Sequence, residues 1–180
     1  MPQRGKGHGT DRGLVAGLLG MRPDDERIPD SFEIARKMSL SYSFGIANLT
    51  SAHPNSVVLE VKGKSGRTLE VQACSLGGGR IMINRLDGLD VNCSCEIPTL
   101  IVHNLDQPGH VAEVTSMLAH KSVNIANMSL YRDKRGGSAV MVVEMDQPLP
   151  KESLEWLEHL EGIVKVTYIN VTEGEEDDVL

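Results

Sequence analysis

The strongest constraint on the fold is an ordered series of apolar patterns in the second half of the chain. Six segments follow one another there: strands over residues 99–103, 123–131, 138–145 and 163–171, and helices near 111–118 and 154–160. In the first of these helices, Val111, Val114 and Leu118 recur at the spacing of one helix face. Because crossovers are right-handed, the order strand, helix, strand, strand, helix, strand predicts a split βαβ sheet with both helices on one face.

The first half of the chain predicts two helices followed by an antiparallel meander. Thr10 is placed to cap a first helix that ends at Gly20, and a second helix begins near Asp30. After Ser41 the apolar residues alternate with period two over five segments, residues 42–46, 57–61, 69–73, 81–83 and 89–91. We therefore expect a meander with one apolar face, and we expect the two helices to cover that face.

Together these patterns predict an α+β chain. Residues 1–96 form the helices and the antiparallel sheet, residues 97–172 form the βαββαβ ferredoxin-like domain, and residues 173–180 form a solvated acidic tail. Pro98 marks the end of the last strand of the first domain.

Charge and composition limit the classes of function. The net charge of −7 does not supply the basic field that a nucleic-acid-binding protein needs. No apolar run approaches the roughly 20 residues that a membrane-spanning helix requires. The chain has three cysteines, and an odd number without a signal peptide is typical of reduced thiols. We expect a cytoplasmic protein without nucleic-acid or membrane partners.

The turn from Asp106 to His110 is a candidate site for a free amino acid. A helix that begins after Gly109 presents backbone N–H groups that suit a carboxylate, and Asp106 can accept from the ammonium group. Asn124 and Asn127, on the strand after this helix, are polar groups that could complete the site. The alternative is that Asp106 and the following proline merely begin a helix.

Three further segments carry candidate functional residues. In the run from Gly7 to Asp11, glycines let a ligand approach the backbone, and His8 and Asp11 can act as acid, base or orienting groups; the alternative is a glycine-rich helix entry. His53-Pro54-Asn55 and the run from Ser75 to Gly79 both lie at strand ends, where functional loops are found. Their alternatives are a proline turn and a backbone bulge.

The cysteines raise the possibility of a metal site. Cys74, Cys93 and Cys95 could supply three thiolates to zinc or to an iron–sulfur cluster. Their spacing is poor, because only the fold can bring Cys74 to the other two. Buried free thiols are the commoner outcome in such a chain, so we assign no metal ligand.

These motifs, taken in order, resemble the beta subunit of bacterial iron–sulfur-dependent L-serine dehydratase. The resemblance runs from Gly7 to about Gln147. It rests on residues 7–11, 14–20, 25–29, 53–55, 75–79 and 98–102, and on the Asp106-x-Pro-Gly turn. The second half by itself resembles the ACT module, which commonly binds an amino acid and pairs with a copy of itself.

The resemblance implies one subunit of a two-subunit enzyme that converts L-serine to pyruvate and ammonia, in serine catabolism and gluconeogenesis. A [4Fe-4S] cluster, held by cysteines of the alpha subunit, acts there as a Lewis acid. The beta subunit is also similar to the allosteric substrate-binding domain of some 3-phosphoglycerate dehydrogenases.

Carried onto this sequence, the resemblance assigns three groups of site residues. Substrate-side catalytic roles fall to His8, Thr10 and Asp11, at an interface with the alpha subunit. The substrate-side loops contain His53, Asn55, Ser75, Gly77 and Gly78. The ACT ligand site takes Asp106, Gly109, His110, Asn124 and Asn127.

One departure from the family pattern supports a rival function. Members of the family carry a Ser-Ser-Ser-His-Thr loop upstream of the Gly-His-Gly-Thr-Asp motif, whereas residues 1–6 precede the motif here and do not match it. The rival is a serine-sensing regulatory module without catalysis, in which serine binding shifts an equilibrium in a partner enzyme.

Overall fold

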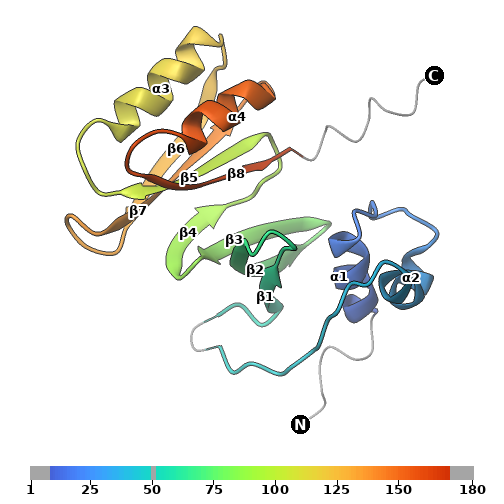
Figure 1. Cartoon of the computed structure of the whole chain (residues 1–180). Helices are drawn as coiled ribbons and strands as arrows, with labels where there is room; N and C mark the ends of the chain where they lie inside the picture. Colours follow the sequence, from blue (N-terminus) through green and yellow to red (C-terminus); the bar gives the residue numbers. More distant parts are fainter. Residues whose placement is uncertain (1–8, 50–51, 171–180) are drawn as a thin grey trace, which may run out of the picture. The chain divides into compact units, whose positions relative to one another are not determined.

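The computed structural model describes residues 9–49 and 52–170. The chain divides into two compact units, residues 1–49 and residues 50–180. The first unit is helical, and the second contains eight strands and two helices among the described residues (Figure 1). His8 and the acidic tail lie outside the described residues.

The first unit consists of α1 (Thr10–Leu18), the 3-10 helix η1 (Ile28–Asp30) and α2 (Ser31–Lys37). Gly20, with φ of 79°, ends α1 in a left-handed turn, and the Met21 N–H reaches back to the Ala16 carbonyl at 3.0 Å. The two helices are held together by a buried hydroxyl, because Ser31 Oγ donates to the Arg12 carbonyl at 3.1 Å. Both predicted helices are therefore confirmed.

The segment after α2 differs from the prediction. Residues 42–46 were expected to form the first strand of the meander, but residues 40–49 contain no strand. The rings of Tyr42 and Phe44 instead pack on Phe32 of α2, with centroids 5.4 Å and 6.3 Å away. The apolar residues do alternate here, but the aromatic ones pack on a helix instead of forming a β-strand. Ile46 is 88% exposed.

The second unit contains two antiparallel sheets of four strands each. The first sheet has the order β1-β2-β3-β4 and is a simple meander. Its strands are β1 (Ser56–Lys62), β2 (Thr68–Gly77), β3 (Arg80–Leu86) and β4 (Leu89–Cys93). Residues 57–61, 69–73, 81–83 and 89–91, the last four segments of the predicted alternation, all fall within these strands.

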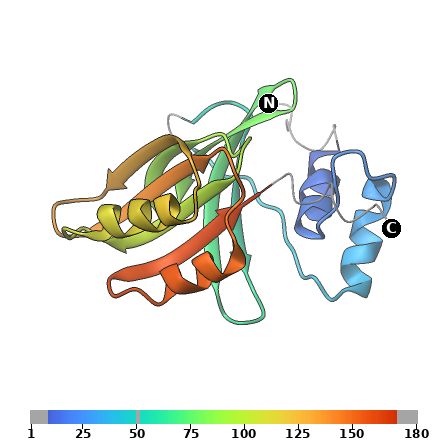
Figure 2. The same cartoon turned by 90° about the horizontal axis from the view of Figure 1, so that it is seen from above.

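The second sheet confirms the predicted βαββαβ order. It is built from β5 (Thr99–Leu105), α3 (His110–His120), β6 (Ile125–Arg132), β7 (Ser138–Met145), α4 (Lys151–Glu158) and β8 (Ile163–Ile169). The strand order is β6-β7-β5-β8, so β6 and β8 are its edges. Helices α3 and α4 lie on the same face of this sheet (Figure 2).

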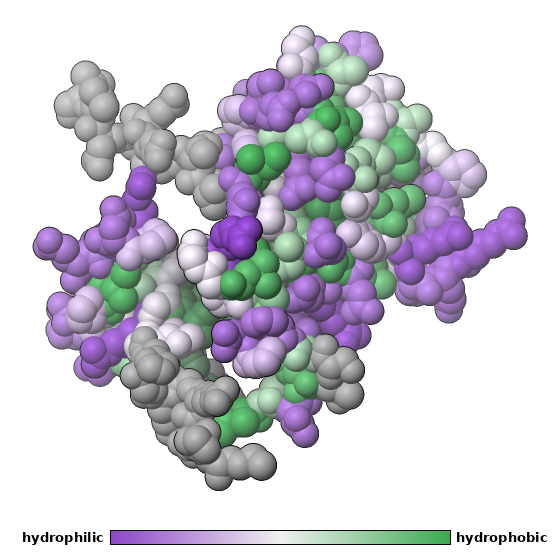
Figure 3. All heavy atoms as spheres, turned by 180° about the vertical axis from the view of Figure 1, so that it is seen from behind, coloured by the Kyte–Doolittle hydropathy of each residue, from purple (hydrophilic) through white to green (hydrophobic). Residues whose placement is uncertain are grey.

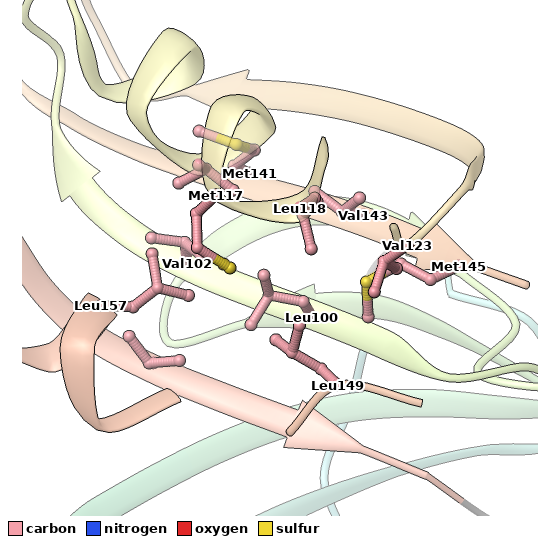
Figure 4. Packing of buried hydrophobic residues seen from close by; sticks show 12 residues of the cluster. Leu100, Val102, Met117, Leu118, Val123, Met141, Val143, Met145, Leu149 and Leu157 are labelled. Atoms are coloured by element: carbon pink, nitrogen blue, oxygen red, sulfur yellow. The ribbon is translucent and has the colours of Figure 1, made fainter. Parts of the chain in front are cut away.

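The face beneath the two helices holds the main hydrophobic core. Leu100 and Val102 of β5 are fully buried there with Met141 and Val143 of β7, and Leu118 of α3 packs onto them (Figure 4). Aromatic residues make up only 3% of the sequence, so aliphatic and methionine side chains fill this space, and methionine adapts well to irregular gaps.

The opposite face of the second sheet is covered by the first sheet. Ile101, Val140 and Val142 point to this side and pack against residues of β3 and β4. This explains why β7 is apolar on both faces, since it is buried on both. The apolar face of the meander thus packs on the second sheet, where we had expected helices α1 and α2. The expected boundary near residue 96 falls inside the second compact unit.

Surface chemistry is mixed. On the face drawn in Figure 3, apolar residues lie in small groups between polar ones. None of the helices in residues 9–49 and 52–170 is long and apolar enough to cross a membrane.

Candidate functional site

Asp106 is tied to the turn between β6 and β7. Its Oδ2 accepts from the Gly136 N–H at 2.9 Å and from Arg132 Nη1 at 3.1 Å. The Gly136 N–H and then the Arg132 guanidinium hold the pKa of this carboxyl below its usual value. Asp106 is therefore an ionised group that fastens the β5–α3 turn to the far end of β6. Gly109, with φ of 111°, then turns the chain into α3.

His110 is a core residue of this turn. It is 7% exposed, and its Nδ1 lies 3.2 Å from Glu113 Oε2. Its Nε2 is buried without a hydrogen-bond partner among the described residues. The ring packs directly on Gly162, where a Cβ atom would lie 2.6 Å from both Cε1 and Nε2. His110 thus faces the turn before β8 rather than an open site.

Asn124 and Asn127 lie at the other end of the sheet. Leu105 pairs with Ser138, whereas Ile125 pairs with Met145, so Asp106 and Asn124 flank opposite ends of β7. Seven residues of strand separate those ends, roughly 23 Å at about 3.3 Å per residue. The structure therefore does not bring these asparagines to Asp106 within one copy of the chain.

Each asparagine has a carboxylate partner of its own. Asn124 Nδ2 donates to Asp146 Oδ2 at 2.5 Å, and Asn127 Nδ2 donates to Glu144 Oε2 at 2.9 Å. These bonds hold both side chains against the chain's own acidic residues at the Thr99 end of the sheet.

The predicted loops of the first sheet lie side by side. Asn55 accepts the Ser75 N–H on its carbonyl at 3.0 Å, and its own N–H donates to His53 Nδ1 at 3.2 Å. His53, Asn55 and Ser75 are all exposed. The structure thus brings together two loops that are about twenty residues apart in sequence.

The three glycines after Leu76 set the shape of the second loop. Gly77, Gly78 and Gly79 all have positive φ, at 86°, 62° and 78°. A Cβ on any of them would meet no atom within 4 Å. Backbone conformation, rather than crowding, therefore demands glycine there.

At the N-terminal motif, the described part begins at Gly9. Gly9 has φ of 71° and precedes α1, in which Thr10 is the first residue rather than the cap. Thr10 is exposed, and Asp11 Oδ1 accepts the neighbouring Arg12 N–H at 2.9 Å. His8 lies outside the described residues.

Sequence reasoning missed a partly buried charged cluster between the two sheets. Lys165 Nζ pairs with Asp87 Oδ2 and donates to the Thr68 carbonyl at 2.9 Å. His103 Nε2 lies 3.6 Å from the same Asp87 oxygen. Four different strands or turns supply these groups, so no local pattern could have indicated them; only the turn-forming Asp87-Gly88 pair was visible in the sequence.

The pKa values of this cluster follow from its burial. Partial burial raises the pKa of Asp87, but the hydrogen bonds from Lys165 and from the Glu70 N–H outweigh it, and the net shift is downward. Burial lowers the pKa of His103 despite the nearby Asp87, and the positive charges of Lys165 and Arg67 add to this. The cluster is thus a Lys–Asp ion pair beside an imidazole that resists protonation.

The described cysteines form one pair and one separate thiol. Cys93 and Cys95 have their Sγ atoms 3.0 Å apart. Cys74 follows Ala73, which faces the core shared by the two sheets, so the alternation of β2 points Cys74 to the opposite face. No three His, Cys, Asp or Glu side chains within residues 9–49 and 52–170 are grouped to hold a metal ion.

The described residues of the second unit line at least two surface hollows. One of about 650 Å³ lies between α3 and α4, beside Met117 and Trp156, and one of about 520 Å³ lies between the β1–β2 turn and β8, beside Arg67 and Lys165. None of the residues that sequence analysis assigned to a site lines either hollow.

Comparison with known proteins agrees with this architecture. Residues 98–161 match the ACT domain family. The L-serine dehydratase beta chain of Peptoniphilus asaccharolyticus is 34% identical over 167 residues, which cover 92% of this chain and 75% of the relative. The probable L-serine dehydratase beta chain of Bacillus subtilis is 34% identical over 164 residues, 91% of this chain and 74% of the relative.

A second kind of relative contains a similar sequence as part of a longer protein. The D-3-phosphoglycerate dehydrogenase of Bacillus subtilis is 24% identical over 162 residues, which are 89% of this chain but 30% of that enzyme. The two beta chains match at higher identity and over most of their own length. The chain therefore belongs to the family of L-serine dehydratase beta chains, and it carries an ACT domain.

Proposed function

We propose that this chain is the beta subunit of an L-serine dehydratase and that, with a separate alpha subunit, it converts L-serine to pyruvate and ammonia. The observation that carries the proposal is 34% identity to a serine dehydratase beta chain over 92% of the sequence. A match of 167 residues spans both compact units. The reaction would serve cytoplasmic serine catabolism that feeds gluconeogenesis.

The [4Fe-4S] cluster of such an enzyme would be held by the alpha subunit. A cluster of this kind takes four thiolates. The cysteines described here offer two adjacent thiols, Cys93 and Cys95, while Cys74 faces away from them. These residues do not fit a cluster, and the proposal gives them no part in the elimination.

The segment that enters α1 would face the alpha subunit near bound serine. Thr10 is exposed at the start of the helix, and Asp11 lies in its first turn. Together with His8, these residues offer an imidazole, a hydroxyl and a carboxylate within four positions, groups able to bind and orient an amino acid. The paired loops that carry His53, Asn55 and Ser75, with the backbone of Gly77 and Gly78, would line the same substrate side.

The ACT domain would bind an amino acid between two copies of the chain. Strand β6 is an edge of its sheet, and its apolar residue Leu130 is 48% exposed. If β6 pairs antiparallel with β6 of a second copy, the start of one strand lies beside the end of the other. Asn124 of the second copy then approaches Asp106 of the first.

Such a site would bring together Asp106 and Asn124, which lie at opposite ends of the sheet within one copy of the chain. Both internal donors to Asp106 bind its Oδ2, so Oδ1 is the oxygen placed to accept from a ligand's ammonium group. The N–H groups at the start of α3, beyond Gly109, suit the ligand's carboxylate. Asn124, with Asn127 behind it, would supply an amide from across the interface.

The direct test is anaerobic co-expression of this chain with an alpha subunit, followed by an assay of pyruvate formed from L-serine. We expect activity from the pair and no activity from either chain alone. An alpha subunit that is fully active without this chain would contradict the proposal.

The second candidate is a serine-sensing module without a catalytic role. The match to a D-3-phosphoglycerate dehydrogenase over 89% of this chain favours it, because a similar sequence there is part of an enzyme named for a different activity. In the co-expression assay, L-serine that binds this chain without pyruvate formation, while it changes the activity of another enzyme, would support the sensor.

A further inference from the structure

The end of β4 brings two thiol groups into contact. In an extended strand, residues two positions apart lie on one face, about 6.6 Å from each other along the chain at about 3.3 Å per residue. Cys93 is the last residue of β4, and Cys95 has the left-handed φ of 55°. This turn folds the second side chain back toward the first, and the two Sγ atoms lie 3.0 Å apart.

The pair sits at the edge of the core that joins the two sheets. Cys93 and Cys95 are 2% and 6% exposed and pack in the same cluster as Ile101 and Val142. Beyond Cys95 the chain reaches the surface, where Glu96 and Ile97 are exposed. The buried pair therefore lies one residue away from an exposed part of the chain.

The two thiols differ in chemistry. A hydrogen bond from Cys95 lowers the pKa of the Cys93 thiol, although burial opposes this, and the same contact together with burial raises the pKa of Cys95. Cys93 is therefore the better nucleophile, because thiolates rather than thiols react with peroxide. Cys95 remains a protonated neighbour in position to react next.

We propose that Cys93 and Cys95 are a site of reversible oxidation and form a disulfide with each other when the chain meets hydrogen peroxide. In the first step the Cys93 sulfur attacks one peroxide oxygen, the O–O bond breaks, and a sulfenic acid and one water form. In the second step the Cys95 sulfur attacks the Cys93 sulfur, an S–S bond forms, and a second water leaves. Two thiols are oxidised and one peroxide is reduced to two waters.

The disulfide closes a loop with a single residue between its cysteines. So short a loop removes little freedom from the unfolded chain and strains the bond, and strained disulfides are the readily reduced ones. We therefore expect dithiothreitol to restore both thiols quickly.

Trypsin offers a direct readout on the full-length wild-type chain. The peptide of residues 86–121 contains Cys93 and Cys95 as its only cysteines, and the peptide of residues 68–80 contains Cys74 alone. After treatment with hydrogen peroxide and alkylation under native and then denaturing conditions, we expect peptide 86–121 to lose two hydrogens and to take up no alkyl group. Peptide 68–80 should still be alkylated, as an internal control.

Three results would overturn the proposal: peptide 86–121 that still takes two alkyl groups, a bridge between two chains, or oxidation at Cys74 first. In Cys95→Ser, a sulfenic acid on Cys93 should accumulate and react with dimedone, whereas Cys93→Ser should give no dimedone adduct on Cys95. Cys74→Ser should behave as wild type. Because the wild-type peptide map needs no substitution, a variant that fails to fold leaves the test intact.

Discussion

At the scale of single residues, positions that look functional in the sequence often have a structural task. His110 was assigned to a ligand site, but its ring packs on Gly162 and its Nε2 is buried. Asp106 was assigned to a ligand's ammonium group, and one of its oxygens already fastens two turns together. These contacts join residues 26 to 52 positions apart, so no local sequence pattern reveals them.

Gly162→Ala should destabilise the chain strongly. The residue has φ of 80°, and the new methyl group would lie 2.6 Å from the His110 ring. A left-handed backbone costs about 1–2 kcal/mol and overpacking costs about 1–3 kcal/mol, so we expect a loss of about 2–5 kcal/mol in the free energy of unfolding, measured with urea. Gly136→Ala, with φ of 72° and no atom within 4 Å of the new methyl, is the control and should lose about 1–2 kcal/mol.

A double variant separates the two causes. His110→Ala removes the ring that meets the new methyl group, so Gly162→Ala should cost less in that background than in wild type. Equal costs in both backgrounds would show that His110 does not crowd Gly162.

His103 and Asp87 predict a loss of stability in acid. The pKa of His103 is lowered on folding, so the unfolded chain binds the proton more tightly, and the free energy of unfolding falls as the pH drops below about 6.5. The pKa of Asp87 is lowered as well, so its contribution is complete above about pH 4 and is lost at still lower pH. Urea unfolding at a series of pH values measures both steps.

His103→Gln tests the first of these steps. With the partly buried imidazole removed, the decline just below pH 6.5 should flatten. His53→Gln, in an exposed loop, should keep the wild-type slope. An unchanged slope in His103→Gln would mean that other groups cause the decline.

At the scale of the elements, the order of strands and helices could be predicted but not what covers each face. The apolar run of β7 has a simple cause, since the strand is buried on both of its faces. The alternation in β1 to β4 showed that one face of the meander is apolar. Periodicity does not show which element covers that face, and the structure places the second sheet there instead of the helices that we expected. At residues 42–46 the same alternation of apolar residues places aromatic rings on a helix, and no strand forms there.

Ile101→Ala should reveal how well the first sheet covers the second. Ile101 is 1% exposed on the face away from α3 and α4. Removing a fully buried side chain costs about 2–5 kcal/mol, so we expect Ile101→Ala to match Leu100→Ala on the helix face in urea unfolding. Val164→Ala, at a position 70% exposed, is the control and should change the free energy of unfolding by less than about 0.5 kcal/mol. A loss at Ile101 as small as that of the control would contradict a shared core between the sheets.

The proposed ACT site predicts complementation between two defective variants. Asp106→Ala and Asn124→Ala should each abolish binding of L-serine in calorimetry, because each removes one side of both sites in a pair. In a mixed pair, one site keeps Asp106 from one copy and Asn124 from the other. A mixture of the two variants, unfolded and refolded together, should therefore recover about one quarter of the wild-type sites.

Complementation distinguishes a shared site from a site within one chain. If both residues served a ligand in the same copy, the mixture would bind no more L-serine than the variants alone. Asn127→Ala, next to the proposed contact, should weaken binding without abolishing it.

At the scale of the whole molecule, the proposed role of this chain is to contribute to a serine pocket while the alpha subunit holds the cluster. The family is shown by the match over both units, and the motifs that indicated it in the sequence are spread along both. The ACT fold agrees with what that sequence pattern predicted, whereas the substrate-side role of the loops at Asn55 and Ser75 stays a prediction. The partner-facing role of the α1 entry stays a prediction, because it depends on a second protein.

The most direct measurement is an anaerobic titration of a fixed amount of alpha subunit with this chain, with pyruvate formation from L-serine as the readout. We expect no pyruvate without this chain, and a rate that rises with added chain until the concentration of this chain equals that of the alpha subunit. A rate that is independent of added chain, or pyruvate formed by this chain without the alpha subunit, would contradict this expectation.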